Sequence, residues 1–242
     1  MGAFPERSFF EVEVQRDPLW LMQPGERFAI EGLLSQLRPA LSVEIGTYDG
    51  GSLRRIAAHS GAVHAFDIDE RAREHADRLD NVTLHLGDSA QTLPRVLEDV
   101  AATGGHVDFA LVDGLHSYDA VTSDARILLA SPACERTVIV FHDSAHAEVR
   151  RALEDLQLRH HPKVALCLLD FVPGYLVRSA PEIDEQIRGL GFNGLALVVL
   201  DAGRRGRPAG DEFFVPVPDL HRAAAESVPR RSSLLERWRR GG

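Results

Sequence analysis

The chain has few cysteines, and this scarcity limits both its cross-linking and its metal chemistry. Among 242 residues only Cys134 and Cys167 occur. They are too few for a disulfide framework, and no Cys/His spacing fits a structural zinc site. A reducing compartment suits such a chain, so we expect it to be cytoplasmic.

Long apolar runs and a net positive charge are also absent. No apolar stretch is long enough to span a bilayer, and the first residues lack a basic segment followed by an apolar one. The net charge is −9, and nucleic acid repels such a surface. The arginine clusters at 204–207 and 237–240 lie in Gly/Pro-rich or terminal segments, where solvated loops are the simpler reading. We therefore expect no membrane and no nucleic-acid partner.

Apolar runs alternate with helical patterns along the chain, which is typical of a parallel α/β sheet. The length suits one domain, with residues 1–40 as an N-terminal cap segment, 41–201 as the core sheet and 202–242 as a loop and tail. The loop at 203–210 is either a lid or unstructured. Strands are predicted at 41–46, 62–67, 82–86, 107–113, 137–142, 164–171 and 195–200, and helices at 26–37, 52–59, 70–78, 90–101, 118–129 and 145–160; a loop with a short helix is expected at 172–193.

The first predicted strand runs into a glycine turn, Gly46-Thr-Tyr-Asp-Gly50-Gly-Ser52. Neither the Gly-Lys-Ser/Thr of a P-loop nor the Gly-x-Gly-x-x-Gly of a dinucleotide site is present. Glycines allow close backbone approach to a ligand, and the amides of a helix beginning at Ser52 would point at it. With Glu44 two residues upstream, the spacing resembles the first motif of class I S-adenosylmethionine (SAM)-dependent methyltransferases. An ordinary turn without a ligand is the alternative.

Acids follow the next two predicted strands. A carboxylate offers two acceptor oxygens, so Asp67 could accept both ribose hydroxyls of an adenosine, with Asp69 as a helix cap. Asp88 resembles the acid beside the adenine amine, with Ser89 helping or capping the next helix. A helix cap is the alternative for each acid. The predicted SAM-binding residues are Glu44, Gly46, Tyr48, Gly50, Ser52, Asp67, Asp88, Ser89 and Asp113.

Two further motifs follow the fourth and fifth predicted strands, Asp113-Gly-Leu-His116-Ser-Tyr and His142-Asp143. Together they resemble metal-dependent small-molecule O-methyltransferases, a branch that includes macrolide-sugar enzymes and cephalosporin-hydroxylase-like proteins. The resemblance extends from about 41 to 143. It implies a Rossmann-like, doubly wound, seven-stranded and mostly parallel sheet with an antiparallel edge, preceded here by an N-terminal helical segment.

In that branch the first Asp binds Mg²⁺, the residue three positions on is the general base, and two acids complete the metal site. The resemblance thus implies Asp113, His142 and Asp143 as ligands and His116 as base. His142 replaces an acid, which weakens the case for Mg²⁺ and favours Mn²⁺ or another transition metal. Alternatively His142 is itself the base.

Three functions remain open. The first is SAM-dependent, metal-dependent methylation of a sugar or another polyhydroxylated small molecule, because vicinal diols chelate metals. The second is a catechol-type phenolic O-methyltransferase, against which the 7% aromatic content argues mildly. The third is a non-catalytic SAM-binding partner subunit. The apolar residues Phe9, Phe10, Trp20 and Leu21 make a homodimer plausible.

Overall fold

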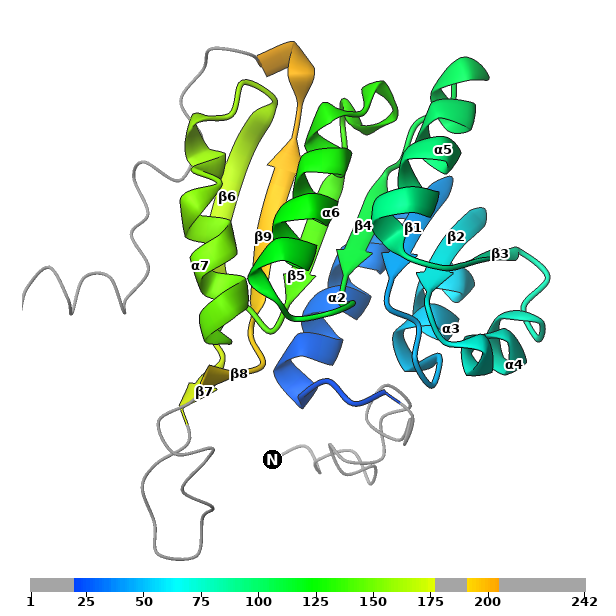
Figure 1. Ribbon diagram of the computed structural model, residues 1–242, viewed down its shortest axis with the longest axis horizontal. Coiled ribbons are helices and arrows are strands. Elements are labelled where there is room, and N and C mark those ends of the chain that lie inside the picture. Colours follow the sequence, from blue (N-terminus) through cyan, green and yellow to red (C-terminus); the bar gives the residue numbers. More distant parts are fainter. Residues whose placement is uncertain (1–19, 177–190, 205–242) are drawn as a thin grey trace, which may run out of the picture. The chain divides into compact units, whose positions relative to one another are not determined.

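A computed structural model describes residues 20–176 and 191–204. Its main feature is a seven-stranded sheet in the order β3-β2-β1-β4-β5-β9-β6 (Figure 1). The first five strands in this order are parallel, so their carboxyl ends share one edge of the sheet. The strands are β1 (Leu41–Ile45), β2 (Ala62–Asp67), β3 (Val82–Leu86), β4 (Phe109–Val112), β5 (Val138–His142), β6 (Val164–Val172) and β9 (Leu195–Leu200).

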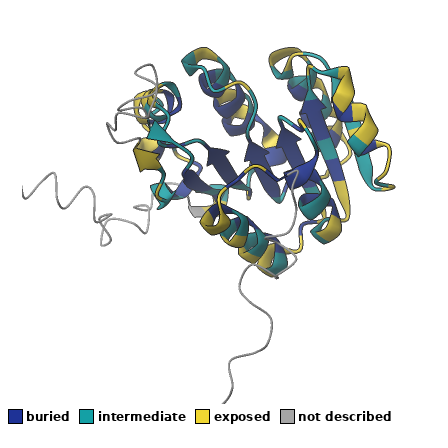
Figure 2. Cartoon of the chain, turned by 90° about the horizontal axis from the view of Figure 1, so that it is seen from below, coloured by how far each residue is buried: buried dark blue, intermediate teal, exposed yellow. Residues whose placement is uncertain are grey.

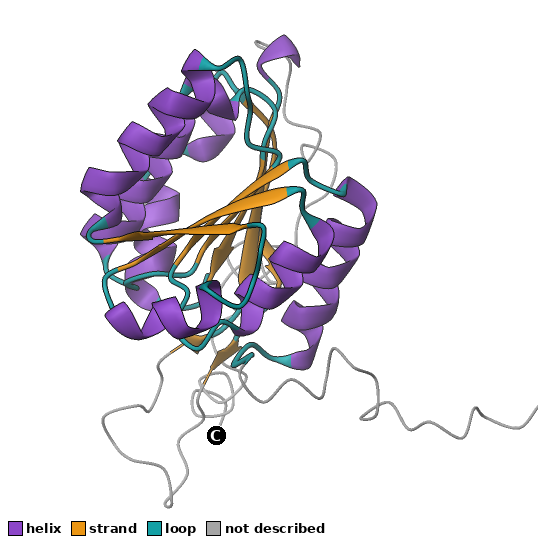
Figure 3. Ribbon diagram, turned by 90° about the vertical axis from the view of Figure 1, so that its right-hand side faces the viewer, coloured by secondary structure: helices purple, strands orange, loops and turns teal. Residues whose placement is uncertain are grey.

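Helices cover both faces of this sheet, as Figure 3 shows, so the predicted doubly wound fold is confirmed. One face carries α2, α3 and α4, whose apolar residues share a core cluster, and the other carries α5, α6 and α7. The helices are α2 (Pro24–Leu37), α3 (Gly51–His59), α4 (Arg73–Ala76), α5 (Ser89–Ala102), α6 (Tyr118–Ala130) and α7 (Ala147–Asp155).

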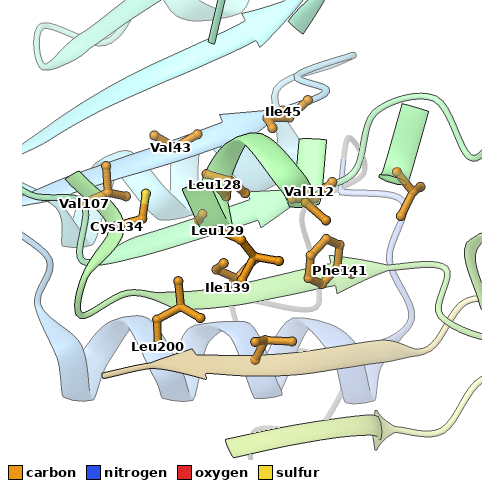
Figure 4. Packing of buried hydrophobic residues seen from close by; sticks show 14 of the residues in the cluster. Val43, Ile45, Val107, Val112, Leu128, Leu129, Cys134, Ile139, Phe141 and Leu200 are labelled. Carbon is orange, nitrogen blue, oxygen red and sulfur yellow. The ribbon is translucent and has the colours of Figure 1, made fainter. Parts of the chain in front are cut away.

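The central strands read as continuous apolar runs because helices bury both of their faces. All four residues of β4 are buried, and the strands form the dark centre of the molecule in Figure 2. On one face Val43, Val112 and Phe141 pack against Leu128 of α6, as the close view in Figure 4 shows. This packing holds the ends of β1, β4 and β5 rigidly side by side.

The predicted antiparallel edge is formed by the last two long strands. β9 pairs antiparallel with β5 on one side and with β6 on the other, which leaves β6 at the edge. A separate two-stranded ladder joins β7 (Tyr175–Leu176) and β8 (Gly191–Phe192) within the segment predicted as a loop. Residues 177–190, where a short helix was predicted, lie outside the described residues.

Two predicted helices are shorter than expected. The prediction at 70–78 becomes a 3₁₀ turn, Glu70–Ala72, followed by α4, and α4 ends early because the chain must turn into β3. The prediction at 145–160 begins late because the amides of Ser144 and Ala145 donate to carbonyls of Gly194 and Asn193. It ends early because Gln157 adopts a left-handed conformation, and a 3₁₀ turn, Leu158–His160, follows.

The predicted N-terminal helix is α2, but residues 1–19, including Phe9 and Phe10, lie outside the described residues. So do 205–242, which hold most of the predicted lid at 203–210. The described residues belong to one compact unit, Met1–Ala209, and the assignment of 1–242 to one domain stays a prediction. Within the described ranges, every helix is too short or too polar to cross a bilayer.

Candidate active site

The carboxyl ends of β1, β4 and β5 open into a cleft of about 440 Å³. Ligands of open α/β sheets bind at this edge. The predicted SAM residues Gly46, Tyr48, Ser52 and Asp113 line the cleft, together with His116, His142 and Asp143. Residues outside the predicted cofactor, base and metal sets also line it: Trp20, Leu21, Met22, Thr47, Asp49, Gly51, Gly114, Phe192 and Asn193.

The glycine turn is shaped by the strand beside it. Gly46 has φ +90°, and a Cβ there would lie 2.1 Å from the carbonyl oxygen of Asp113. The predicted reason for this glycine was close approach to a ligand, but the structure shows close approach to the tip of β4. Gly50 has φ +71° and precedes α3, and a Cβ on it would overlap His75.

Gly46→Ala is expected to lower the free energy of unfolding by more than the roughly 1–3 kcal/mol that left-handed strain costs. The added overlap with Asp113 would push β4 and the turn apart, so SAM affinity should fall too. Thermal denaturation and SAM titration measure both effects. Gly32→Ala is the matched control, because Gly32 is exposed within α2 with nothing within 4 Å of a new Cβ, and it should be neutral or stabilising.

Asp67 holds the glycine turn from the tip of β2. Its Oδ2 accepts the amides of Thr47 and Tyr48 at 2.8 and 2.9 Å, and its Oδ1 accepts the amide of Asp69 at 2.8 Å. Asp67 does not line the cleft. Its contact with ribose stays a prediction, and the hydrogen bonds add a role in shaping the turn.

The remaining acids that follow β2 and β3 cap the helical turns after them. Asp69 accepts the amide of Arg71, as predicted, and Asp88 accepts the amide of Ala90 at the start of α5. Ser89 donates to Asp124 at 2.7 Å rather than capping a helix. Asp88 and Ser89 lie outside the cleft lining, so their predicted contact with adenine remains a prediction.

Glu44 lies below the glycine turn and is fully buried. The Thr47 hydroxyl donates to its Oε2 at 3.2 Å. Burial is the main reason that its pKa rises to about 8, and Asp113 and Asp67 raise it further. Glu44 is therefore mostly protonated at neutral pH, and it supports the turn from beneath rather than lining the cleft.

Because this pKa lies above its ordinary value, folding requires proton uptake at Glu44 between about pH 4.5 and 8, and stability is lost as pH rises through that window. Glu44→Gln removes the titration. We expect its melting temperature to exceed that of wild type more at pH 9 than at pH 4.5. Melting curves at the two pH values test this, and an equal difference at both would contradict the burial of a protonated acid.

The two histidines and two acids at the tips of β4 and β5 form one cluster. Asp113 Oδ1 lies 2.8 Å from His142 Nδ1 and 3.1 Å from His116 Nε2. The other ring nitrogen of His116 lies 2.9 Å from Asp143 Oδ2. Asp113 does not cap the helix that follows it, because Ser117 caps α6.

The carboxylates strongly favour the charged histidines. Hydrogen bonds that the His116 ring donates to Asp113 and Asp143 raise the pKa of His116 to about 9. Burial lowers the pKa of His142, but Asp113, Glu26 and Asp143 outweigh it and raise that pKa to about 10. Burial raises the pKa of Asp143, but the two histidines bring it to about 2. An imidazolium neither ligates a metal nor accepts a proton, so either role requires this proton to leave.

The cluster also has the geometry of a cation site. One ligand atom each from Asp113, His116 and His142 lies within 4.8 Å of the other two. This set contains two of the predicted ligands, but His116 takes the place of Asp143. Asp143 instead accepts the amide of Asn193 and contacts His116 from a left-handed conformation, φ +53°. Strain of this kind is concentrated at functional sites.

The most informative residue that the sequence did not reveal is Glu26. It lies in the first turn of α2, is 1% exposed, and places Oε1 3.5 Å from His142 Nε2. In the sequence, Glu26 is recognisable only as a helix-capping residue, because it follows the N-cap residue Gln23 by three positions. Tyr118, at the end of the motif after β4, donates to Asp155 on α7 and does not line the cleft, whereas Tyr48 does.

A family model described as "Methyltransferase domain" matches residues 43–144. This range holds both the glycine turn and the clustered acids and histidines. Residues 43–144 are therefore similar to methyltransferase domains. The predicted enzyme class, a SAM-dependent methyltransferase, is thereby confirmed. No curated protein sequence matches the chain.

Solved methyltransferases share the fold at low identity. An O-methyltransferase from Bacillus cereus in complex with SAH (S-adenosylhomocysteine) is 17% identical, with 74% of this chain and 82% of that chain covered and a TM-score of 0.52. TomG from Streptomyces achromogenes, an O-methyltransferase of tomaymycin synthesis in complex with SAM, is 18% identical over 74% and 81%, with a TM-score of 0.52. A putative O-methyltransferase from Klebsiella pneumoniae is 16% identical over 75% and 82%, with a TM-score of 0.50.

Proposed function

We propose that the domain transfers a methyl group from SAM to a hydroxyl of a polyhydroxylated small molecule, with a sugar as the leading acceptor and a divalent cation at the site. The observation that carries this proposal is the position of the cluster. Asp113, His116, His142 and Asp143 line the same cleft as the glycine turn. Donor and acceptor groups can therefore be held face to face, and such positioning supplies much of the rate of a displacement reaction.

SAM would lie against the glycine turn. Gly46, Tyr48 and Ser52 line the cleft, and the first amides of α3 point at it. Asp67 would meet the ribose from the tip of β2, and Asp88 with Ser89 the adenine from the tip of β3. The neighbours from Bacillus cereus and Streptomyces achromogenes contain SAH and SAM, which supports this cofactor.

The residues at the tips of β4 and β5 fit a divalent cation, which Asp113 and His142 would hold. The donor atoms of the cluster converge, and the buried Nε2 of His142 makes no hydrogen bond. The imidazole of His142 suits a transition metal better than Mg²⁺, which prefers oxygen ligands. A bound dication lowers the pKa of a hydroxyl that it holds and fixes its direction.

His116 is the general base in this proposal. Asp143 faces its Nδ1 and Asp113 faces its Nε2, and a cation held by Asp113 would release Nε2 to accept the proton. The His116 side chain is also more exposed than that of His142, at 34% against 10%. The acceptor oxygen attacks the methyl carbon, the bond from that carbon to the sulfonium breaks, and SAH leaves. The hydroxyl proton passes to His116 Nε2, and the resulting imidazolium is stabilised by two carboxylates.

The low aromatic content argued against a phenolic acceptor, but one observation of the structure favours it. Trp20, Tyr48 and Phe192 line the cleft, so an aromatic acceptor would find apolar contacts, although sugar rings also pack on aromatic faces.

The homodimer remains part of the proposal. Trp20, one of the residues proposed for its interface, is 2% exposed and belongs to the core, whereas Leu21 is 68% exposed.

Purified protein, SAM and a panel of sugars and catechols test the reaction. Methyl transfer to a hydroxyl should be lost with EDTA and restored by a divalent cation, and the preferred acceptor separates the two enzymatic alternatives. SAM binding without turnover on any hydroxylated acceptor would instead support the non-catalytic partner subunit.

The pH profile reports on the base. Because the pKa of His116 is raised to about 9, the fraction able to accept a proton should grow about tenfold per pH unit between pH 6 and 8. We expect kcat/KM to rise accordingly and to level off near pH 9. A bound cation opposes the imidazolium, so the plateau should begin at lower pH when metal is saturating. A flat profile from pH 6 to 9 would contradict a histidine base.

A further inference from the structure

The donors at the tips of β4 and β5 are of two chemical types. A carboxylate oxygen of Asp113 lies 2.8 Å from the Nδ1 of His142. The His142 side chain is only 10% exposed, so solvent does not freely reorient its ring. Its second nitrogen, Nε2, is buried without a hydrogen bond, and Oε1 of Glu26 lies 3.5 Å away.

Glu26 is fixed in this position by the backbone. Its Oε1 accepts the amide of Gly194 at 2.6 Å, just before β9, and its Oε2 accepts the amide of Gln23 at 2.6 Å, just before α2. The bond from Gly194 links Glu26 to a segment 168 residues away along the chain, and the bond from Gln23 holds the carboxylate against the start of its own helix. The carboxylate cannot turn away from His142 without breaking them.

Carboxylates face both ring nitrogens of His142, since Asp113 lies at Nδ1 and Glu26 lies at Nε2. A cation held between Asp113 and Nδ1 would exclude a proton from Nδ1, and Glu26 would then hold the remaining ring proton on Nε2. The other nitrogen then presents its lone pair, and metal-binding histidines are commonly oriented in this way. We propose that Glu26 is a positioning residue that makes His142 Nδ1 a nitrogen ligand, and that the Asp113–His142 pair thereby selects a first-row transition-metal dication such as Mn²⁺ over Mg²⁺. This inference rests on the divalent cation of the proposed function.

Ligand chemistry supports the selection. Mg²⁺ takes oxygen ligands in near-ideal octahedra, whereas first-row transition-metal dications accept an imidazole nitrogen more readily. Mn²⁺ has the lowest affinity of that series, so it is the most stringent probe of the selection. Asp143, which would offer more oxygen, is engaged by His116 and by the amide of Asn193. Mixed nitrogen and oxygen donors therefore remain at the cleft.

Metal binding to the cofactor-free protein tests this without any turnover. Mn²⁺ is titrated by electron paramagnetic resonance, Mg²⁺ is added as competitor, and pulsed spectra detect nitrogen bound to Mn²⁺. Wild type should bind Mn²⁺ at least about 100-fold more tightly than Mg²⁺ and show nitrogen coupling. His142→Asp, an oxygen-donor variant, should reduce that ratio at least tenfold.

Glu26→Gln should weaken Mn²⁺ binding about 10–100-fold and leave Mg²⁺ binding unchanged. A purely structural defect would weaken both metals. The matched control is Glu31→Gln, on the same helix but paired with Arg55 and His59, and it should leave the ratio unchanged. Melting curves identify any variant that fails to fold, and the wild-type competition needs no variant.

Equal affinity of wild type for the two metals, or an equal loss of both in Glu26→Gln, would overturn the inference. A protein that transfers methyl groups to hydroxyls but binds no Mn²⁺ would overturn it as well, while leaving methyl transfer itself intact.

Discussion

Replacing Asp113 with asparagine is expected to reduce methyl transfer about 10³-fold or more. Its Oδ1 lies 2.8 Å from His142 Nδ1 and 3.1 Å from His116 Nε2. An asparagine of the same shape keeps the packing but removes the charge that attracts a cation and holds both rings. Transition-state stabilisation worth several kcal/mol is then lost, and each 1.36 kcal/mol is tenfold in rate. Initial rates at saturating SAM and metal measure the effect.

The control for this variant is Asp108→Asn, at the opposite end of β4. Asp108 accepts the amides of Ala40 and Leu41 and pairs with His106, far along the strand from the cleft. We expect Asp108→Asn to lower stability slightly and to leave turnover within a few-fold of wild type. If Asp113→Asn keeps more than a tenth of wild-type turnover while folded, the cluster is not the catalytic centre.

The second large effect separates the two histidines. His116→Ala should lower kcat about 10²–10⁴-fold, which is the usual contribution of a general base, with SAM and metal affinities unchanged. His142→Ala should lose metal affinity first, and its turnover should recover in part at high metal concentration. Isothermal titration with SAM and with Mn²⁺, beside steady-state rates, separates these outcomes.

His106→Ala is the matched histidine control, because His106 pairs with Asp108 at the other end of the sheet. Wild-type turnover in both His116→Ala and His142→Ala would show that neither ring is the base. Loss of metal binding in His116→Ala would instead make His116 the third ligand, as the convergence of the three donor atoms allows. The proton would then need another acceptor.

Much of the fold was predictable because its signals are local. Strands such as Ala62–Asp67 and Leu195–Leu200 match their predicted ends, since apolar runs bounded by turn residues recur along the chain. The predicted element boundaries are wrong where contacts between distant parts of the chain determine them. The start of α7 moves because the amides of Ser144 and Ala145 bond to the chain before β9, which no local pattern reveals.

The candidate site divides in the same way. The motifs around Asp113 and His142 follow neighbouring parallel strands, so their convergence could be predicted, and the structure places them 2.8 Å apart. The partner of His116 could not be predicted, because Asp143 reaches it from a left-handed backbone conformation. Nor could the burial of Glu26 beside His142, since a first-turn acid of a helix is normally a solvated cap.

The order of residues along the chain by itself determined the α/β class, the glycine turn and the acids and histidines at strand tips, because each depends on spacing within a few residues. Only the tertiary structure decided what those residues contact. It placed Asp67 under the turn, Asp88 on a helix end and Glu26 behind His142, because hydrogen-bond partners and burial are set by elements that pack from far apart in the chain.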